Sequence, residues 1–572
     1  MAKGRWTILL LGTFILGGFA WGLSKYIVPH EKPQLPTDPP WFVDVTDQVG
    51  LDFVHDAGPV GDYFMPQQVG SGVALFDFDN DGLLDILLLQ NGGPKSTSTN
   101  RLFRQLKDGT FKDVSKGSGL DINGHNMGVA IGDVNNDGLL DVLVTQYSGI
   151  KLFLNQGDGT FRDATEEAGL SLPSWGASAA FFDFDRDGWL DLVVVCYVDY
   201  DPSWECKGPN AQRDYCAPKT FKGRVSRLFR NVTGKTPGKV RFEDVTVKSG
   251  LGSIGGPGLG VLCADFNGDG WTDIFIANDG EPNRLWINGH DGTFTEEAVK
   301  RGIAYDIYGH AQAGMGAALG DVHGDGSLDV FVTHLAQETH TLWQQGSRGL
   351  FTDKTNPSGL LKSHWRGTGF GTLFGDFTNA GRLDLAIVNG AVAAQAPPPA
   401  SPLGPFWSKY GQRNQLFAGD GHGKFRDVSL SNTPFCGKDN VARGLAQGDF
   451  DSDGGLDLLV TTIGGRARLF RNVAKDRGHW LSIRAYDPAL KRDAIGSSVQ
   501  VHAGDRKWVR WLHPAESYLS SSEPRAHFGL GDVGVVDRIE ITWPDGDLET
   551  FPGGPVDRRI ELRKGDGKRV QP

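Results

Sequence analysis

The 572-residue sequence is poor in cysteine and has no excess of positive charge. None of its five cysteines has the spacing of a zinc finger or of c-type haem attachment. With 57 Lys and Arg against 69 Asp and Glu, the formal net charge is −12, so the chain lacks an overall basic surface for a phosphate backbone. GxSxG, HExxH and Walker motifs are missing as well. We therefore expect no nucleic-acid partner and no catalytic residues.

Glycine is abundant, in contrast. The 80 glycines are about twice the usual share of roughly 7% in soluble proteins. The 33 Phe and 15 Trp exclude a disordered chain, and the lack of a Gly-X-Y period excludes collagen. A glycine-rich globular chain of this length calls for a search for internal repeats.

The N-terminus predicts export. Lys3 and Arg5 precede an uncharged apolar run of 17 residues, 7–23, which is at the short end of the spanning range. Gly18 and Ala20 fit cleavage after Ala20, so residues 1–28 are either a signal peptide or an uncleaved membrane anchor, and residues 29–40 form a proline-rich linker. The positive charge before the run places the remaining chain outside the cytoplasm. We expect a periplasmic, cell-surface or secreted protein, with the membrane as a partner if the segment stays uncleaved.

Seven segments share one pattern, in which an apolar strand ends in Asp, a DxDxDG-type loop follows, and a second apolar strand begins. The loops start at Asp77, Asp133, Asp183, Asp265, Asp321, Asp376 and Asp449. An FxD-type strand precedes each loop, the first of them in residues 41–46, and none follows the last loop. Four short strands per repeat are typical of a propeller blade. We predict an all-β fold with a seven-bladed β-propeller over residues 41–477, closed by residues 41–46; an open solenoid is the alternative.

The aspartate loops have the pattern of a cation site. In D-x-D-x-D-G-x-x-D, carboxylates at positions 1, 3, 5 and 9 and the carbonyl at position 7 can converge on one hard cation, and Gly at position 6 permits the turn. Several oxygens in a flexible loop suit Ca²⁺ better than Mg²⁺. Five loops fit best, and their expected ligands are Asp77, Asp79, Asp81, Leu83 and Asp85; Asp133, Asn135, Asp137, Leu139 and Asp141; Asp183, Asp185, Asp187, Trp189 and Asp191; Asp265, Asn267, Asp269, Trp271 and Asp273; and Asp449, Asp451, Asp453, Gly455 and Asp457.

Two loops are weaker candidates. The loop of Asp321, Asp325 and Asp329 has His323 at position 3, and imidazole is a poor calcium ligand. The loop of Asp376 and Asp384 has Thr378 at position 3 and Ala380 at position 5, so it is expected to be empty. About five to six structural calcium ions are therefore expected.

These repeats resemble the FG-GAP/VCBS repeats of integrin-α-like propellers, over residues 41–473. The resemblance implies calcium in loops between the first and second strands of each blade, on the face opposite the ligand. From Gly478 a different β-rich segment follows, and its SYLSSSEPRAHFGLG and VDRIEITWPDG stretches resemble the ASPIC/UnbV domain. We therefore expect a small β domain over residues 478–572.

Both long insertions, at about residues 199–222 and 391–412, fall on the face opposite the aspartate loops. Cys206 and Cys216 in the first insertion are the candidate disulfide. The same face is expected to collect ligand-binding candidates from loops that enter the central channel: His125, Trp175, His310, His364, Trp365 and Arg443. Isolated surface side chains without a common ligand are the alternative.

The predicted function is binding rather than catalysis. Repeated cation loops without a nucleophile or acid beside them favour an extracytoplasmic, calcium-stabilised binding or adhesion protein for a protein or glycan ligand. The alternative is a calcium-dependent extracytoplasmic polysaccharide lyase or hydrolase that uses the His and Arg residues at the channel mouth.

Overall fold

The computed structural model describes residues 38–570 except 209–210, 236–238 and 397–400. The signal or anchor segment 1–28 and most of the linker lie outside the described residues. Residues 39–572 form one compact unit. Among the described residues, no helix has the length and apolar character needed to cross a membrane.

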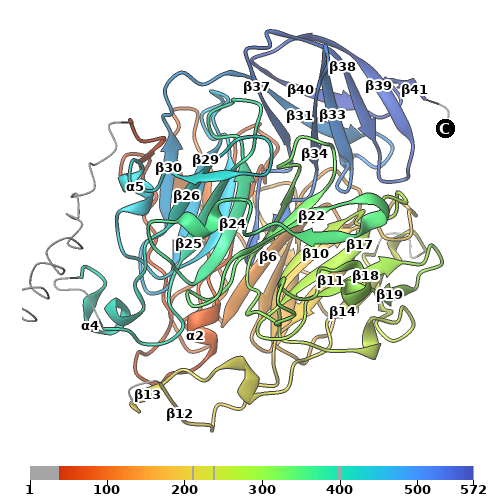
Figure 1. Ribbon diagram of the computed structural model, residues 1–572. Helices are drawn as coiled ribbons and strands as arrows, with labels where there is room; N and C mark the ends of the chain where they lie inside the picture. Colours follow the sequence, from red (N-terminus) through yellow and green to blue (C-terminus); the bar gives the residue numbers. More distant parts are fainter. Residues whose placement is uncertain (1–37, 209–210, 236–238, 397–400, 571–572) are drawn as a thin grey trace, which may run out of the picture. The chain divides into compact units, whose positions relative to one another are not determined.

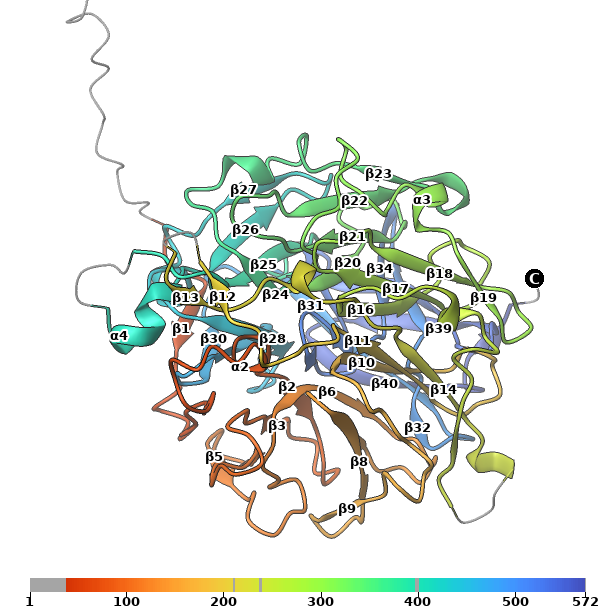
Figure 2. The same ribbon diagram turned by 90° about the horizontal axis from the view of Figure 1, so that it is seen from below.

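Seven four-stranded antiparallel units form the propeller (Figures 1 and 2). Blade 1 contains β2 (Val73–Phe76), β3 (Asp85–Leu88), β4 (Arg101–Gln105) and β5 (Phe111–Asp113); blade 2 contains β6 (Asn126–Gly132), β7 (Asp141–Gln146), β8 (Gly149–Asn155) and β9 (Phe161–Asp163); blade 3 contains β10 (Gly176–Phe182), β11 (Asp191–Cys196), β14 (Arg227–Asn231) and β15 (Phe242–Asp244). Blade 4 contains β16 (Gly258–Ala264), β17 (Asp273–Asn278), β18 (Arg284–Asn288) and β19 (Phe294–Glu296); blade 5 contains β20 (Ala317–Gly320), β21 (Asp329–Val332), β22 (Thr341–Gln345) and β23 (Phe351–Asp353). Blade 6 contains β24 (Gly369–Gly375), β25 (Asp384–Asn389), β26 (Gln415–Gly419) and β27 (Phe425–Asp427), and blade 7 contains β28 (Ala442–Gly448), β29 (Asp457–Thr462), β30 (Arg468–Asn472) and β1 (Phe42–Asp44).

The predicted ring closure is confirmed. Strand β1 pairs antiparallel with β30, with Phe42 opposite Asn472 and Asp44 opposite Phe470, so the N-terminal strand is the outer strand of the last blade. Closure removes two free sheet ends, which explains why the chain starts with a lone outer strand. The open-solenoid alternative is wrong.

Glycine permits close packing of the inner strands around the axis. A Cβ atom on Gly316 would lie 2.1 Å from the carbonyl oxygen of Phe370, and one on Gly260 would lie 2.5 Å from that of Met315. Side chains at these points would push neighbouring blades apart. Part of the high glycine content therefore follows from the narrow centre of the ring.

The helices in the described part of the connections are short. They are α2 (Pro66–Val69), α3 (Ala298–Arg301), α4 (Gly404–Trp407) and α5 (Thr433–Cys436), with 3₁₀ turns η1 (Pro218–Thr220), η2 (Thr233–Lys235), η3 (Leu251–Ser253), η4 (Ser347–Gly349), η5 (Leu360–Lys362) and η6 (Ser408–Tyr410). A two-stranded hairpin of β12 (Cys206–Lys207) and β13 (Arg213–Asp214) stands apart from the blades.

The C-terminal domain consists of two packed sheets. One sheet has the order β32-β31-β37 with β40 parallel to β31, and the other has the order β34-β33-β38-β39-β41. The bounds are β31 (His479–Asp487), β32 (Arg492–Asp493), β33 (Ser498–Ala503), β34 (Arg506–Trp511), β37 (Ala526–Gly531), β38 (Val535–Thr542), β39 (Leu548–Pro555), β40 (Arg558–Arg563) and β41 (Lys568–Arg569). Alternating apolar residues of both sheets, among them Ile483, Val501, Phe528 and Ile541, make a separate core.

A hairpin of the C-terminal domain enters the propeller channel, which the sequence did not predict. Strands β35 (Ala515–Glu516) and β36 (Ser520–Ser521) extend the sheet of blade 1, with Ser521 parallel to Ala74 of β2. Ser517 exchanges two backbone hydrogen bonds with Ala317 of blade 5, and the Val129 amide of blade 2 donates to the Leu519 carbonyl. We call residues 513–525 the plug. It contacts inner strands all around the ring and fills the axis.

Candidate metal sites and binding face

Each aspartate loop joins the first and second strands of its blade, and its position 9 carboxylate anchors it. In all seven loops, one oxygen of that carboxylate accepts a hydrogen bond from the backbone amide of position 2, at 2.9–3.2 Å. In the first loop, for example, the Phe78 amide donates to Asp85. The other oxygen accepts an amide at the end of the third strand, such as that of Gln105 or Asn472. The position 9 carboxylate therefore ties three strands of its blade together.

Position 1 folds the loop back on itself. In all seven loops its carboxylate accepts the amide of the position 6 glycine at 2.7–3.1 Å, as in Asp77 with Gly82 and Asp265 with Gly270. Each of these glycines has a φ between +80° and +95°. The sequence predicted this role for position 6.

Position 4 is also left-handed in all seven loops, which sequence reasoning missed. The φ values of Asn80, Asn136, Arg186 and Ser452 lie between 56° and 58°, that of Asn379 is 52°, and Gly268 and Gly324 have +79° and +69°. Four of these residues are Asn or Gly with a following Asp, and one more is Asn, so the frequent N-D and G-D pairs were the available signal.

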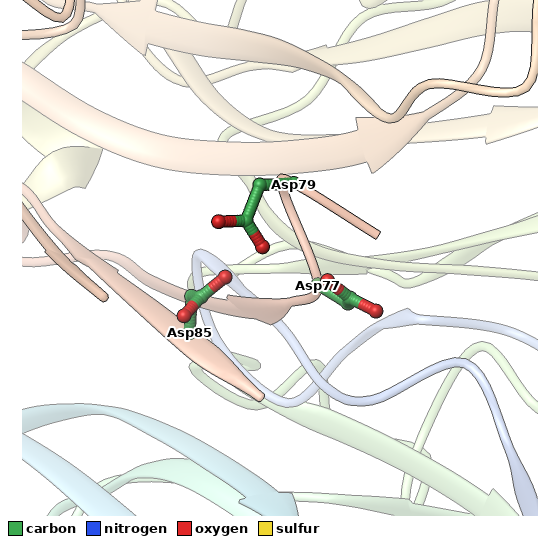
Figure 3. Close-up of side chains that lie close together, drawn as sticks. All are labelled: Asp77, Asp79 and Asp85. Atoms are coloured by element: carbon green, nitrogen blue, oxygen red, sulfur yellow. The ribbon is translucent and has the colours of Figure 1, made fainter. Parts of the chain in front are cut away.

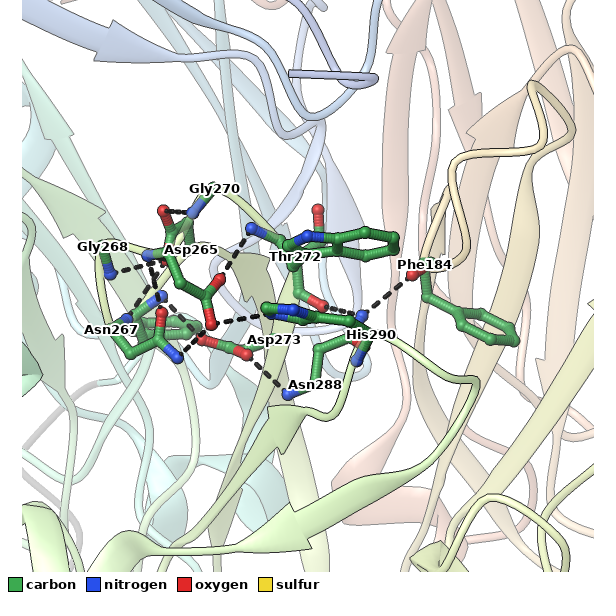
Figure 4. Close-up of polar contacts among 12 residues, drawn as sticks. Phe184, Asp265, Asn267, Gly268, Gly270, Thr272, Asp273, Asn288 and His290 are labelled. Atoms are coloured by element: carbon green, nitrogen blue, oxygen red, sulfur yellow. Dashed lines mark hydrogen bonds and ion pairs between the residues drawn. The ribbon is translucent and has the colours of Figure 1, made fainter. Parts of the chain in front are cut away.

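Carboxylates converge in the loops with four aspartates. Ligand oxygens of Asp77, Asp79 and Asp85 lie within 4.8 Å of one another (Figure 3), and the same holds for Asp183, Asp185 and Asp191 and for Asp449, Asp451 and Asp453. Anionic oxygens at this spacing fit a hard divalent cation. The loops with Asn135 and Asn267 have one carboxylate fewer. In the second of them, Asn267 and His290 contact Asp269, and Figure 4 shows Asn267 and His290 close to Asp265 and Asp273.

Burial disfavours the ionised form of these carboxylates and raises their pKa values. It raises the pKa of Asp85 and of Asp273 to about 8, against opposing backbone hydrogen bonds. Burial also raises the pKa of Asp133 and of Asp183 to about 6. A bound cation would offset this cost, because it stabilises the ionised carboxylates.

The two weaker loops differ in structure as well. In the fifth loop, His323 Nδ1 lies 2.8 Å from Asp329 Oδ2, so the imidazole contacts the position 9 carboxylate. In the sixth loop, Asp376 accepts the amides of Ala380, Gly381 and Arg382. That loop has carboxylates only at positions 1 and 9.

The C-terminal domain contacts several aspartate loops and brings arginines to them. Arg492 is 3% exposed, and its guanidinium donates to Asn136 Oδ1 and to the Gly188 carbonyl, between the second and third loops. Arg559 Nη2 lies 3.2 Å from Asp449 Oδ2 of the seventh loop. The Trp508 indole donates to the Gly381 carbonyl of the sixth loop. This face of the propeller is therefore an interdomain contact.

Family comparisons match both parts of the chain. The FG-GAP-like repeat model matches residues 77–144, 133–194 and 265–332, and the ASPIC and UnbV model matches residues 487–569. The chain carries FG-GAP-like repeats and an ASPIC/UnbV domain. The repeat matches include the first five aspartate loops, and the ASPIC/UnbV domain includes the plug.

Relatives with similar sequences are named cartilage acidic protein 1. The protein from Xenopus tropicalis is 26% identical over 539 residues, which cover 89% of this chain and 74% of the frog protein. The protein from Homo sapiens is 27% identical over 321 residues, 54% of this chain and 44% of the human protein. Among solved structures, an Agrocybe aegerita lectin described as recognising non-reducing terminal N-acetylglucosamine has a TM-score of 0.36 and 16% identity, covering 71% of this chain and 90% of the lectin chain. The matched families and relatives point to a non-enzymatic repeat protein of the extracellular, adhesion-like kind.

The opposite face of the FG-GAP propeller is covered near its axis. We call this cover the roof: residues 56–69 with α2, the hairpin β12–β13, and the insertion of blade 6 around α4, which lie together below the blades in Figure 1. Asp214 of the hairpin is 3% exposed, and it accepts hydrogen bonds from the Tyr410 hydroxyl at 2.7 Å and the Ala394 amide at 2.8 Å. The insertions of blades 3 and 6 therefore meet across the channel mouth.

The roof hairpin contains the expected disulfide. Cys206 and Cys216 are bonded, while Cys196, Cys263 and Cys436 are free and buried. The bond closes a loop with a sequence separation of 10 residues, for which the chain-entropy account gives about 2–3 kcal/mol.

Removing this disulfide should open the hairpin without unfolding the blades. In the Cys206→Ser/Cys216→Ser variant we expect cleavage by trypsin at Lys207 or Arg213 to become roughly 30–150-fold faster, because the local stability falls by about 2–3 kcal/mol. Mass spectrometry of the fragments measures this. Cleavage at blade residues is the internal control and should not change; an equal rise there would mean that the bond supports the whole propeller.

The predicted ligand-face residues divide into two groups. Trp175 and Arg443 are only 2% and 0% exposed, so they are core residues of the channel and offer no surface for a ligand. The Arg443 guanidinium donates to the carbonyls of Gln68 and Ala442 and lies 3.7 Å from the centre of the Phe370 ring. His125 is half-buried against Phe64, Trp365 is half-buried, and His310 and His364 are exposed. The sequence prediction assumed an open channel. The roof and the plug fill that channel, so the residues inside it are buried and only those outside the roof are exposed.

Exposed apolar residues on the roof side were not among the sequence candidates. Trp204 in the disulfide insertion is 57% exposed, and Tyr308 in the connection between blades 4 and 5 is 79% exposed. The connection of Tyr308 supplied only His310 as a sequence candidate, and the insertion of Trp204 supplied only the disulfide pair. Their exposure is a property of the folded loops that the residue pattern does not show.

Proposed function

We propose that this protein is an extracytoplasmic, calcium-stabilised, non-catalytic binding protein that recognises a protein or glycan through the roof side of its propeller. The observation that carries the proposal is the division of its surfaces. The ASPIC/UnbV domain contacts the aspartate-loop face and the plug fills the axis, so the roof side is the broad face that the C-terminal domain leaves open.

Calcium is the cation we propose for the loops. Three loops hold carboxylate oxygens within 4.8 Å of one another, and flexible all-oxygen loops suit Ca²⁺. The expected five to six ions would neutralise buried carboxylates between the first two strands of each blade. Their contribution is to stability, because the loops lie on the face opposite the proposed ligand face.

Exposed aromatic and imidazole side chains support the choice of the roof side. Trp204 and Tyr308 offer large flat surfaces, which suit stacking on a sugar ring or packing against a protein loop. His310 beside Tyr308, and His364 beside Trp365, add hydrogen-bonding groups at the same side of the ring. These pairs come from separate connections, so they form a broad surface and not a deep pocket.

A binding screen tests the proposal. The chain from Trp41 onward would be screened in calcium against arrays of glycans and immobilised matrix proteins, and the affinity of any hit would be measured for Trp204→Ala and Tyr308→Ala. We expect at least one of the two variants to lower the affinity about tenfold, as loss of an aromatic anchor does. Leu350→Ala is the matched control, because Leu350 is 49% exposed in a connection between third and fourth strands, on the aspartate-loop side.

Two results would count against the proposal. Binding that neither roof-side variant weakens would place the ligand elsewhere. Turnover of a glycan that His310→Ala or His364→Ala abolishes would favour the lyase or hydrolase alternative instead.

A further inference from the structure

The third strand of each blade carries a residue that matches position 3 of the aspartate loop. This partner position is the residue before the last residue of the strand. It is Arg104, Arg230 and Arg471 in the blades whose loops have Asp79, Asp185 and Asp451 at position 3. It is Leu154 and Ile287 where position 3 is Asn135 and Asn267, and Gln344 and Ala418 where position 3 is His323 and Thr378. An arginine is present only where position 3 is a carboxylate.

Direct contacts explain this match. Arg104 Nε lies 2.6 Å from Asp79 Oδ2, and its Nη2 lies 2.9 Å from Asp81 Oδ2. Arg230 Nη2 lies 2.5 Å from Asp185 Oδ2 and 3.2 Å from Asp187 Oδ2. The arginine therefore bridges the carboxylates of positions 3 and 5.

The seventh loop divides the same task between two arginines. Arg471 Nε lies 3.2 Å from Asp451 Oδ2, and Arg477 Nη2 lies 2.5 Å from Asp453 Oδ2. Arg471 is in the partner position, and Arg477 follows the last strand of the ring. Both position 3 and position 5 again face a guanidinium.

The asparagine loops satisfy position 5 without an arginine. Asn135 Nδ2 donates to Asp137 Oδ2 at 2.8 Å, and Asn267 Nδ2 donates to Asp269 Oδ2 at 2.6 Å (Figure 4). Here the position 3 side chain itself supplies the donor that the arginine supplies elsewhere. A carboxylate at position 3 cannot donate, so those loops need an outside donor and a counter-charge.

We propose that Arg104 and Arg230, and Arg471 together with Arg477, are resident counter-ions that neutralise positions 3 and 5 when no cation is bound. They keep the carboxylates in the arrangement that binds the ion, and they release the position 3 carboxylate when calcium binds. The calcium step rests on the proposed function; the cation-free step does not. These arginines set how strongly each loop depends on calcium for its order.

Hydrogen–deuterium exchange of the chain from Trp41 onward, with EDTA or with excess CaCl₂, tests the first loop separately from the others. In EDTA, Arg104→Leu should make the amides of residues 77–85 exchange about fivefold faster, because two partly exposed ion pairs are lost and like charges remain. Adding Asp79→Asn to Arg104→Leu should restore the protection, because position 3 and the partner position then hold Asn and Leu, as they do in the second blade. With CaCl₂, Arg104→Leu should regain the protection of the unmodified chain.

Arg101→Leu is the matched control. Arg101 lies on the same strand, and its guanidinium pairs with Asp113 at 3.2 Å, away from the loop. Unchanged exchange of residues 77–85 in Arg104→Leu with EDTA would overturn the inference, and so would a loss that Asp79→Asn does not restore. If CaCl₂ changes no loop in any form, the calcium proposal fails, while the EDTA results still decide the role of the arginine.

Discussion

Replacing Tyr518 by alanine is expected to lower the free energy of unfolding by about 3–5 kcal/mol, the usual cost of truncating a buried aromatic residue. The Tyr518 side chain is 0% exposed at the tip of the plug, and its ring centre lies 5.0 Å from that of Phe370 on the inner strand of blade 6. Its hydroxyl donates to the Val69 carbonyl at 3.0 Å, which joins the plug to the roof. The substitution would leave a cavity on the axis of the ring, where several blades meet.

Urea unfolding followed by tryptophan fluorescence measures this effect. Tyr518→Phe is the matched control: it keeps the ring and removes one hydrogen bond, so its cost should be about 1–2 kcal/mol. An alanine variant within about 1 kcal/mol of the unmodified chain would show that the plug is only loosely held. Limited proteolysis in the plug would then be the next measurement.

The expected loss of stability means that the ASPIC/UnbV domain, through its plug, stabilises the propeller. The inner strands carry small residues, so a channel remains along the axis of the ring. In this protein, the plug hairpin fills that channel. Ser517 pairs with blade 5 and its Oγ accepts the Thr372 amide of blade 6, while the Ser521 Oγ donates to Val129 of blade 2. The serine-rich SYLSSS stretch thus supplies short polar side chains that satisfy inner-strand groups.

The repeat explains how much of the fold was predictable. Seven aspartate loops and seven FxD strands out of phase fixed the number of blades and the closure by residues 41–46, because each pattern is local and recurs. The plug could not be predicted in this way. SYLSSSEPR occurs once, and its partners are backbone groups of inner strands and of α2, as far as 449 residues away in the chain, which no periodicity reveals.

The binding face was predictable only in part. Topology placed His310 and His364 on the roof side of the ring, but it could not show that Trp175 and Arg443 are buried beneath a roof. The roof is joined by contacts such as that between Asp214 and Tyr410, which are 196 residues apart in the chain. In the aspartate loops, the carboxylate positions repeat in the sequence, whereas the arginines of the third strands stand out only when the strands are aligned in space.

Calcium removal is expected to give the largest change in stability. If five loops each bind calcium and the free concentration is tenfold above their dissociation constants, binding contributes about 7 kcal/mol to the free energy of unfolding. Affinities of extracellular calcium modules are commonly near 10⁻⁴ to 10⁻³ M, so about 10 mM CaCl₂ suffices. Urea unfolding in CaCl₂, MgCl₂ and EDTA measures the effect, and Mg²⁺ should not reproduce it.

The pH dependence separates cation binding from other effects of salt. In EDTA, burial raises the pKa of Asp183 and of Asp449 to about 6 and that of Asp85 to about 8, all above the value of 3.8 for an unperturbed aspartate. The folded state therefore binds more protons than the unfolded state between about pH 4 and 8, and the contribution of these groups to stability falls as the pH rises through that range. Calcium binds the ionised carboxylates, so its stabilising effect should grow over the same range.

The free energies of unfolding in EDTA and in CaCl₂ should therefore differ more as the pH rises. From pH 5.5 to pH 8 we expect the gain in the free energy of unfolding on adding CaCl₂ to increase, because the ion then displaces fewer protons from the loops. An Asp85→Asn variant, which keeps the size of the side chain but not its charge, should lose part of both the calcium gain and its pH dependence. A gain that is the same at both pH values, or that MgCl₂ reproduces, would mean that the ionised aspartate loops are not where the cation acts.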